Sequence, residues 1–445
     1  MLSRLHTEQQ KQTAAGTIRL ICSASARTVA CLDSLGDTEL ALICERQIHM
    51  SHSNEPNRRQ FHQTLALGAA SAMAGVSLVP ASALGRGQVS PGERLTLGVI
   101  GLGSRGFNLL DEFLQHPDAQ IVAICDVEKL HYRDRVWGRG TAHGRKAGKQ
   151  RVETAYAKQK SSTLAKGLAV YSDYRELIQH KDLDAVVVAT PDHWHAKCTL
   201  DALRAGKDVY CEKPVTHLFH EGQLVYREVA KQKAVFQTGS QQRSAEEFHR
   251  AVELIFNDHI GDIRQIEVGL PAGYPKPQGD TKVIATPESL DYEMWCGPAP
   301  KLPYMRARHH RWWRGHRAYG GGVLMDWIGH HNDIAHWALR VDRSGPTKVE
   351  AVDWTFPKTD VYDSPHHYTI KCEYRGGVTS TISSKNKMGT KFIGERGWIH
   401  VTRGKLSASD ARLLSPKLIV GEKRVFKSPG HTKNCLLYTS PSPRD

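Results

Sequence analysis

Short apolar runs alternate with segments of helical periodicity over residues 94–240. In chain order the apolar runs read LTLGVI, QIVAIC, LAVY, LDAVVVA, DVYC and AVFQ. Such runs, separated by helical segments, predict a doubly wound α/β domain with a parallel sheet. Ligands bind these sheets beyond the carboxyl ends of the strands. Three polar segments fall at those ends: Thr190-Pro191, Glu212-Lys213-Pro214 and residues 239–243.

A different pattern follows after residue 260. The runs DIRQIEVGL, KVEAVDWTF, HYTIKCEYRGGVTSTISS and TKFIGERGWIHVT are typical of strands, and YRGGV within the third predicts a hairpin turn. Between the first two runs, MDWIGHHNDIAHW has the pattern of a helix. Asp326, His330 and Asp333 stand there at i, i+4 and i+7, which places them on one helix face.

A glycine motif, GxGxxG, separates the first apolar run from the helical segment after it. Gly101, Gly103 and Gly106 form the motif, with Ser104 and Arg105 inside it. Glycines at these positions let the backbone approach a pyrophosphate, which the start of the helix then attracts. The alternative is a glycine-rich turn in an unrelated α/β domain.

Asp126 ends the second apolar run, twenty residues beyond Gly106, as a ribose-binding acid does. Its carboxylate would accept hydrogen bonds from the adenosine ribose and repel a 2′-phosphate, which favours NAD over NADP. A basic stretch follows, and one of its side chains could bind that phosphate, so NADP stays open; the plainer interpretation is a solvated insertion. The stretch comprises Arg133, Arg135, Arg139, Arg145, Lys146 and Arg151.

Residues 50–83 are typical of a twin-arginine export signal. The pair Arg58-Arg59 precedes a weakly hydrophobic stretch over residues 65–79, and the small residues Ala81-Ser82-Ala83 follow. The alternative is a surface helix with a chance arginine pair. The apolar stretch is too short, and too rich in alanine and glycine, to span a membrane stably.

The two ends of the chain look foreign to the fold. Residues 1–49 lack sustained periodicity and precede a start at Met50, so we expect a doubtful upstream leader. Residues 435–445, CLLYTSPSPRD, look like one reading frame of a sequencing adapter. On that interpretation the natural chain is truncated near Asn434.

The formal net charge is +14 over 445 residues. A basic surface favours anionic substrates or envelope polymers. The sequence contains no recognisable nucleic-acid-binding module, so we expect no nucleic-acid partner. Scattered, solvated lysine and arginine side chains are the simpler explanation of the charge.

Several motifs, in this order, resemble the glucose–fructose oxidoreductase/inositol dehydrogenase (Gfo/Idh/MocA) family. They are GxGxxG, ATPDHWH (residues 189–195), EKP (212–214) and GGGVLMDWIGHHNDIAHW (320–337). LDYEMWCGPAP (290–300) resembles the exported branch of that family. The resemblance implies an NAD(P)-binding Rossmann domain over residues 94–215. It also implies a C-terminal α/β substrate domain, truncated here, with an open, mostly antiparallel sheet over residues 216–434.

The resemblance further implies a catalytic trio of Lys213, Asp326 and His330. His330 would act as the acid/base, because a histidine suits proton transfer near neutral pH. Asp326 would orient it and bind substrate, and Lys213 would hold the reacting oxygen. Pro214 restricts the backbone of the preceding lysine and so keeps the ammonium in place. The alternatives without a catalytic role are that Lys213 is exposed to solvent and that Asp326 and His330 form a surface ion pair.

The expected cofactor-binding residues are those around the glycine motif and the strand ends. They are Gly101, Gly103, Ser104, Arg105, Gly106, Asp126, Thr190, Pro191, His195, Glu212, Lys213 and Gln241. His195 would line the nicotinamide pocket or, alternatively, cap the helix after it. Trp312 and Trp313 would stack on a sugar ring, and packing is the alternative; Asp333 is a further substrate contact. The spacing D-x₃-H-x₂-D also fits a metal site, but we expect no metal.

Together these features predict an NAD(P)-dependent oxidoreductase that takes hydride from a secondary hydroxyl of a sugar, sugar derivative or cyclitol. One alternative is an NAD-dependent glycosidase or lyase that oxidises a ring hydroxyl transiently. Another is a non-catalytic sugar-binding module, against which the joint retention of the trio argues. A twin-arginine substrate travels folded, so we expect a periplasmic protein that carries tightly held NAD. Family resemblance implies a homo-oligomer.

Overall fold

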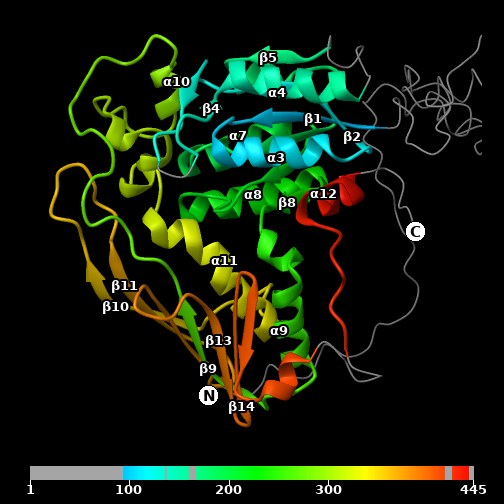
Figure 1. Ribbon diagram of the computed structural model, residues 1–445, viewed down its shortest axis with the longest axis vertical. Helices are drawn as coiled ribbons and strands as arrows, with labels where there is room; N and C mark the ends of the chain where they lie inside the picture. Colours follow the sequence, from blue (N-terminus) through cyan, green and yellow to red (C-terminus); the bar gives the residue numbers. More distant parts are fainter. Residues whose placement is uncertain (1–93, 136–137, 160–166, 416–422, 440–445) are drawn as a thin grey trace, which may run out of the picture. The chain divides into compact units, whose positions relative to one another are not determined.

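The computed structural model describes residues 94–135, 138–159, 167–415 and 423–439 (Figure 1). These residues belong to one compact unit, Val79–Asp445. The predicted leader (1–49) and export signal (50–83) lie outside the described residues. Among the helices of the described part, none is long and apolar enough to cross a membrane.

The N-terminal domain has a six-stranded sheet in the order β5-β2-β1-β6-β7-β8, and every pairing in it is parallel. The strands are β1 (Leu95–Ile100), β2 (Ala119–Cys125), β5 (Ala169–Tyr171), β6 (Ala185–Val188), β7 (Asp208–Cys211) and β8 (Phe236–Thr238). β1, β2 and β6 are the most apolar runs, and they occupy the buried centre of the sheet because helices cover it.

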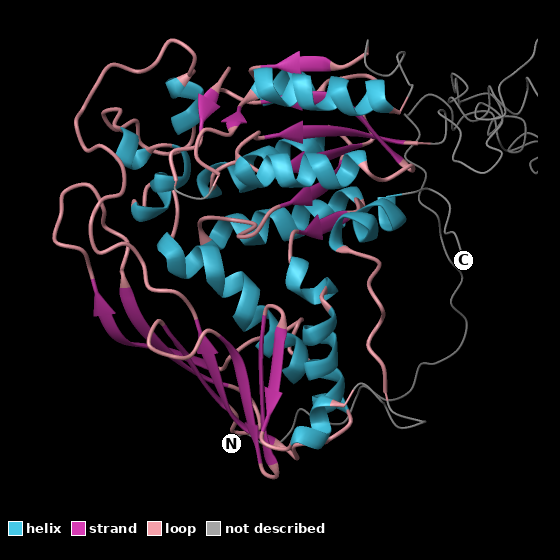
Figure 2. Cartoon of the chain, in the orientation of Figure 1, coloured by secondary structure: helices cyan, strands magenta, loops and turns pink. Residues whose placement is uncertain are grey.

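Helices flank this sheet (Figure 2). They are α3 (Ser104–Leu114), α4 (Arg145–Lys158), α6 (Tyr174–Ile178), α7 (Asp192–Arg204) and α8 (Phe219–Gln232). The chain leaves β1 in one direction to β2 and β5, then returns to β6 on the other side of β1. That reversal opens a crevice at the carboxyl ends of β1 and β6.

The parallel sheet continues to Thr238, later than the boundary expected at residue 215. α8 and β8 complete it, since β8 pairs with β7 in parallel. The EKP motif therefore lies within the N-terminal domain, in the loop between β7 and α8. The N-terminal domain therefore ends one helix and one strand after the EKP motif.

The C-terminal domain has a seven-stranded sheet in the order β10-β11-β12-β9-β13-β14-β15. Its strands are β9 (Ile263–Gly269), β10 (Lys348–Thr355), β11 (His367–Glu373), β12 (Thr379–Ser383), β13 (Gly389–Gly394), β14 (Gly397–Thr402) and β15 (Lys405–Ala408). All pairings are antiparallel except that of β12 with β9, which confirms the predicted sheet. The predicted hairpin turn is also present: Gly376 and Gly377 have φ of +86° and +82°, in the region that favours glycine.

Two helices, α9 (Glu246–Phe256) and α11 (Gly322–Leu339), pack on this sheet and close its core. α11 runs from the N-terminal domain toward the sheet (Figure 1), and its first turns carry the predicted substrate residues. Near the other domain lie η3 (Gln241–Ser244), α10 (Tyr292–Cys296), η4 (Arg306–Arg308) and η5 (His310–Gly315).

A last helix, α12 (His431–Thr439), packs against α3 of the N-terminal domain. Cys435 and Leu436 are buried in the hydrophobic core there, and Arg105 contacts His431. The predicted adapter boundary after Asn434 thus falls inside a helix, and the origin of residues 435–445 stays a prediction.

Candidate active site

A cavity of about 510 Å³ opens at the crevice between β1 and β6 and extends to α11. Most residues that the sequence singled out line it. They are Gly101, Gly103, Ser104, Arg105, Asp126, Thr190, Pro191, His195, Glu212, Lys213, Gln241, Trp313, Asp326 and His330. Three predicted residues, Gly106, Trp312 and Asp333, are not part of the lining.

The glycine motif forms the turn between β1 and α3. Gly101 has φ +92°, and a Cβ atom there would lie 2.7 Å from the main-chain oxygen of Ala189. A Cβ on Gly106 would lie 1.9 Å from the oxygen of Gly101, so this glycine serves close helix packing rather than cofactor contact. A Cβ on Gly103 would meet nothing within 4 Å. The open space above Gly103, next to the N-terminus of α3, fits a pyrophosphate.

Asp126 follows β2 at the edge of this turn. Its Oδ2 accepts from the main-chain N–H of Leu102 at 2.6 Å, and its Oδ1 from that of Glu128 at 2.8 Å. Burial raises its pKa, and these two bonds oppose the rise. Each oxygen retains a further lone pair for a ribose hydroxyl. The residues therefore fit the adenosine end of NAD.

Two arginines of the basic stretch lie at the same edge, so the stretch is not only a solvated insertion. Nη1 of Arg145 donates to the main-chain oxygen of Asp126 at 2.9 Å. Nη1 of Arg133 donates to Oγ of Ser104 at 2.5 Å. Arg133 lines the cavity, and Arg145 lies beside Asp126 at its edge.

Lys213 and Asp326 meet across the domain junction. Nζ of Lys213 lies 2.8 Å from Oδ1 of Asp326 and donates to its main-chain oxygen at 2.7 Å. Nε of Arg314 lies 3.3 Å from the other carboxylate oxygen. Burial alone would raise the pKa of Asp326, but the charges of Arg314 and Lys213 hold it well below its usual range. Asp326 is therefore a permanent carboxylate that fixes two cations.

His330 lies one helical turn after Asp326 and lines the same cavity. Burial, together with the charges of Lys213 and Arg403, lowers its pKa to about 2, so the ring is neutral. Asp326 does not orient it as expected, because the carboxylate contacts Lys213 and Arg314 instead. Within the described residues, Nδ1 of His330 is buried without a hydrogen-bond partner.

His195 and Glu212 stabilise the loops that carry other site residues. The ring nitrogens of His195 lie 2.5 Å from the oxygen of Pro214 and 2.9 Å from that of Thr190. His195 therefore ties the EKP loop to the end of β6, as well as lining the cavity. Oε1 of Glu212 accepts from Nε of Arg105 at 2.7 Å, which anchors the start of α3.

The structure separates the two predicted tryptophans. Trp313 lines the cavity, with the guanidinium of Arg314 over its ring at 4.2 Å. Trp312 is buried elsewhere, where its Nε1 donates to Asp134 at 3.2 Å. Successive residues of a 3₁₀ helix point about 120° apart, so only one of the pair faces the cavity. Trp312 therefore has a packing role, and Trp313 remains a candidate for contact with the substrate.

Asp333 is also misplaced by the sequence analysis. Its carboxylate binds Arg243 at 2.7 and 2.8 Å, and Arg243 also binds Asp342. Seven residues of helix rise about 10 Å, so Asp333 shares a face with Asp326 but lies beyond the cavity. Its role is an ion pair between α11 and η3.

The cavity is also lined by residues outside the predicted set, among them Asp192, Arg314 and Arg403. Asp192 begins α7 inside the quoted ATPDHWH motif, and its Oδ2 is buried without a partner. Burial raises its pKa to about 6, against the charge of Arg314. Its position at a strand end was available as a clue. Arg314 lies in η5, within the basic and aromatic stretch 306–322, whose arginines the sequence offers as partners for sugar hydroxyls or a carboxylate. Arg403 lies in the turn between β14 and β15 and has no such clue.

Two family models match the chain. One, described as "Oxidoreductase family, NAD-binding Rossmann fold", covers residues 95–240. The other, described as "Oxidoreductase family, C-terminal alpha/beta domain", covers residues 275–408. Both belong to the Gfo/Idh/MocA group, and together they span both described domains.

Curated relatives include oxidoreductases and glycosidases. The chain is 25% identical over 325 residues to "Uncharacterized oxidoreductase YrbE" of Bacillus subtilis (strain 168), covering 72% of this chain and 75% of that protein. It is 32% identical over 156 residues to "Glycosyl hydrolase family 109 protein" of Stenotrophomonas maltophilia (strain K279a), covering 35% of this chain. That match spans only 29% of the glycosidase relative's length.

Among solved structures, the aldose-aldose oxidoreductase from Caulobacter crescentus, complexed with glycerol, has a similar fold. Its TM-score is 0.52 at 18% identity, with 78% of this chain and 88% of that chain covered. The likeness concerns the fold alone. With both family models matched in order, the chain belongs to the Gfo/Idh/MocA family of oxidoreductases and has an NAD-binding Rossmann domain.

Proposed function

We propose that this protein oxidises a secondary hydroxyl of a sugar, sugar derivative or cyclitol. The observation that carries the proposal is the Lys213–Asp326 pair beside neutral His330, in the cavity that also contains the glycine turn. When bound, NAD supplies the hydride acceptor. The remaining chemistry belongs to side chains of this chain.

Lys213 would bind the reacting oxygen and stabilise negative charge as the hydroxyl proton leaves. Asp326 would hold the ammonium in place through its 2.8 Å contact. His330 would accept the proton, because its ring is neutral and lines the cavity. Developing negative charge on the oxygen would raise the pKa of His330 as the transfer proceeds.

Trp313 and Arg314 supply a wall for a sugar ring. The indole offers an apolar face, and the neighbouring guanidinium offers donors for hydroxyls. Arg403 and Asp192 add a fixed cation and a carboxyl group whose pKa is about 6. A polyhydroxylated ring suits this mixture of donors, acceptors and aromatic surface.

A glycosidase that oxidises a ring hydroxyl transiently is the second candidate. The 32% identity to a family 109 glycosyl hydrolase over 156 residues favours it. The same trio would serve, since oxidation acidifies the adjacent C–H and permits elimination of the glycosidic bond. The two candidates differ in their products: one accumulates an oxidised sugar, and the other releases a free aglycone with no net oxidation.

One experiment separates them. The purified full-length chain is supplied with NAD and a panel of free sugars, cyclitols and nitrophenyl glycosides, N-acetyl-α-galactosaminide included. Accumulation of an oxidised sugar or cyclitol, with an equivalent amount of NADH or of a second, reduced substrate from the panel, supports the oxidoreductase. Nitrophenol release without net NADH supports the glycosidase, and neither product from any compound that binds contradicts both.

We further propose export through the twin-arginine route with retained NAD, reoxidised within one cycle or between two substrates. Residues 50–83 support the route, and the buried carboxylate of Asp126 supports NAD over NADP. Denaturing the purified protein and identifying released nucleotide by mass spectrometry tests retention. Complete exchange with added labelled NAD within one turnover would contradict it.

We also propose a homo-oligomer that forms through the open sheet. Edge strand β10 is exposed along nearly its whole length, and its side chains include Val349, Val352 and Trp354. Exposed apolar surface of this kind marks an interaction site. Sedimentation of the full chain and of Trp354→Lys tests the proposal; a monomeric wild type would contradict it.

A further inference from the structure

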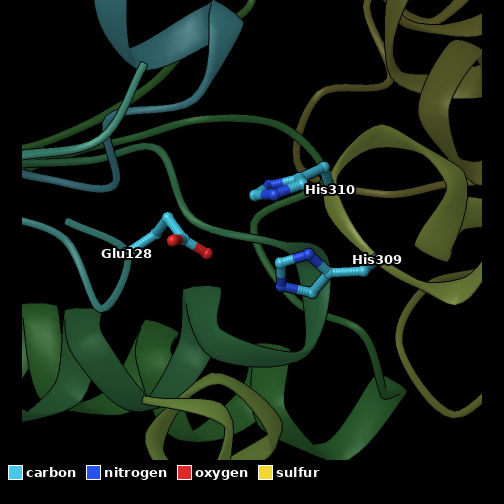
Figure 3. Close-up of side chains that lie close together, drawn as sticks. All are labelled: Glu128, His309 and His310. Atoms are coloured by element: carbon cyan, nitrogen blue, oxygen red, sulfur yellow. The ribbon is translucent and has the colours of Figure 1, made fainter. Parts of the chain in front are cut away.

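A histidine-rich cluster lies at the adenosine end of the cavity, away from the Lys213–Asp326 pair. Glu128 comes from the loop after β2, two residues beyond Asp126. His309 and His310 come from the junction of η4 and η5. One ligand atom from each of the three lies within 4.8 Å of the others, and all three residues line the cavity. Figure 3 shows the carboxylate and both rings turned toward a common space.

One side chain of this cluster, His309, is buried without any hydrogen bond to the described residues. His309 is only 1% exposed, and neither of its ring nitrogens has a partner among the described residues. Buried polar atoms are nearly always paired, so two orphaned nitrogens on one ring require an explanation. A ligand that accepts their lone pairs provides one.

Neighbouring side chains hold the cluster in place. His131 stacks on His310 with ring centroids 3.6 Å apart, and Oγ of Ser289 donates to Oε1 of Glu128. The nearby cation Arg306 is neutralised by Asp134 at 2.7 Å.

We propose that Glu128, His309 and His310 bind one divalent transition-metal ion of the zinc class. Two imidazoles and a carboxylate are a donor set that zinc takes, with a further coordination position open. The hydrogen bond from Ser289 orients the carboxylate, as outer-shell partners of metal ligands do. The sequence predicted no metal, so this proposal departs from that prediction. The site does not depend on the proposed reaction.

The ion would connect the loop beside Asp126 to the segment that carries Trp313 and Arg314. Those two residues follow His310 within η5, and Arg314 contacts Asp326. Fixing His309 and His310 therefore fixes one wall of the substrate region relative to the nucleotide region. Metal binding should raise thermal stability as well, since an ion bound only by the folded state stabilises it.

The test uses the full-length chain without a polyhistidine tag, stripped with a chelator and then titrated with Zn²⁺ and Co²⁺. We expect one equivalent bound, a Co²⁺ absorption spectrum of low-symmetry N/O coordination, and a higher midpoint of thermal unfolding. Glu128→Gln keeps the shape of the side chain, and His310→Gln keeps a polar side chain. Each should weaken Zn²⁺ binding by about 10-fold or more.

His220→Gln is the matched control, because His220 is an exposed histidine on α8. It should leave the affinity unchanged. Failure of folded wild type to bind Zn²⁺ or Co²⁺ would overturn the proposal, as would affinities that the two cluster variants do not change. Stoichiometric displacement of Zn²⁺ by NAD would also overturn it, since the cluster would then be part of the nucleotide site.

Discussion

Nζ of Lys213 lies 2.8 Å from Oδ1 of Asp326, and each side chain is only 12% exposed. The lysine belongs to the loop after β7 and the aspartate to α11, so the pair joins the two domains at the cavity. Removing one member of a buried ion pair leaves an uncompensated charge. Here Arg314 remains beside Asp326, so the aspartate keeps one cation.

Lys213→Met should therefore affect chemistry more than stability. We expect kcat to fall by about 10²–10³, because a group that stabilises developing charge is lost. Breaking a buried ion pair typically costs about 3–5 kcal/mol, and the loss in unfolding free energy here should be smaller than that. Steady-state kinetics and denaturant unfolding measure the two. Lys207→Met is the control, since that ammonium donates to the oxygen of Leu183 and, among the described residues, does not line the cavity.

His330→Gln should remove the proton acceptor while preserving a polar side chain. We expect kcat to fall by about 10²–10⁴, the usual contribution of a positioned acid/base. His331→Gln is the matched control: His331 is the next residue of α11, is fully buried and does not line the cavity. Equal losses in both variants would show a structural role for this turn of helix rather than proton transfer.

Asp126→Asn should shift the cofactor preference toward NADP. The amide keeps one acceptor oxygen for the N–H of Leu102 or Glu128 but removes the charge that repels a 2′-phosphate. Arg133 and Arg145 are already at that edge. We expect the ratio of kcat/KM for NADP over NAD to rise about 10-fold, equivalent to about 1.4 kcal/mol. An unchanged ratio would mean that Asp126 does not face the ribose.

Asp333→Asn should leave the reaction alone. Its carboxylate binds Arg243 away from the cavity, and both side chains are partly exposed, at 24% and 32%. We expect a loss of about 0.5–1 kcal/mol in unfolding free energy and no more than a twofold change in kcat and KM. A large rise in substrate KM would restore the substrate contact that the sequence analysis expected.

Acid should destabilise the fold through its buried histidines. Burial lowers the pKa of His193 and of His331 to about 4, from a reference of 6.5. Between those values the unfolded chain binds more protons, so the unfolding free energy decreases as pH falls below 6.5. The slope is about 1.4 kcal/mol per pH unit for each such histidine.

Asp192 opposes part of this slope, because its raised pKa stabilises the fold as pH falls toward 3.8. Denaturant titrations at about pH 7 and about pH 5 measure the difference in unfolding free energy between these two values. His193→Gln should reduce this difference by up to the contribution of one histidine. A pH dependence of stability that His193→Gln leaves unchanged would show that His193 titrates normally.

Local patterns in the sequence were sufficient for much of the fold and for part of the site. Strand–glycine–helix order places Gly101 and Gly103, and a strand end places Asp126, because each depends on neighbouring residues only. Helical spacing likewise places Asp326 and His330 on one face. These predictions required no knowledge of how distant segments meet.

The predictions failed where tertiary packing determines which residues reach the cavity. Periodicity cannot say how far along α11 the cavity extends, so Asp333 was included although it lies beyond. Trp312 and Trp313 are adjacent residues of the same type, so the sequence cannot show which of them faces the cavity. The turn of η5 directs Trp313 toward it. Arg314 reaches Asp326 from η5, and the basic stretch 306–322 does not show which of its arginines makes that contact.

The most direct test of the central claim follows a deuterium label. The full chain is mixed with NAD and with sugars or cyclitols deuterated at each secondary carbinol carbon, and the nicotinamide is examined by mass spectrometry after denaturation. Binding of each compound is verified by a change in tryptophan fluorescence. We expect deuterium on the nicotinamide with wild type and its loss in Lys213→Met and His330→Gln. Absence of label from every compound that binds would contradict it.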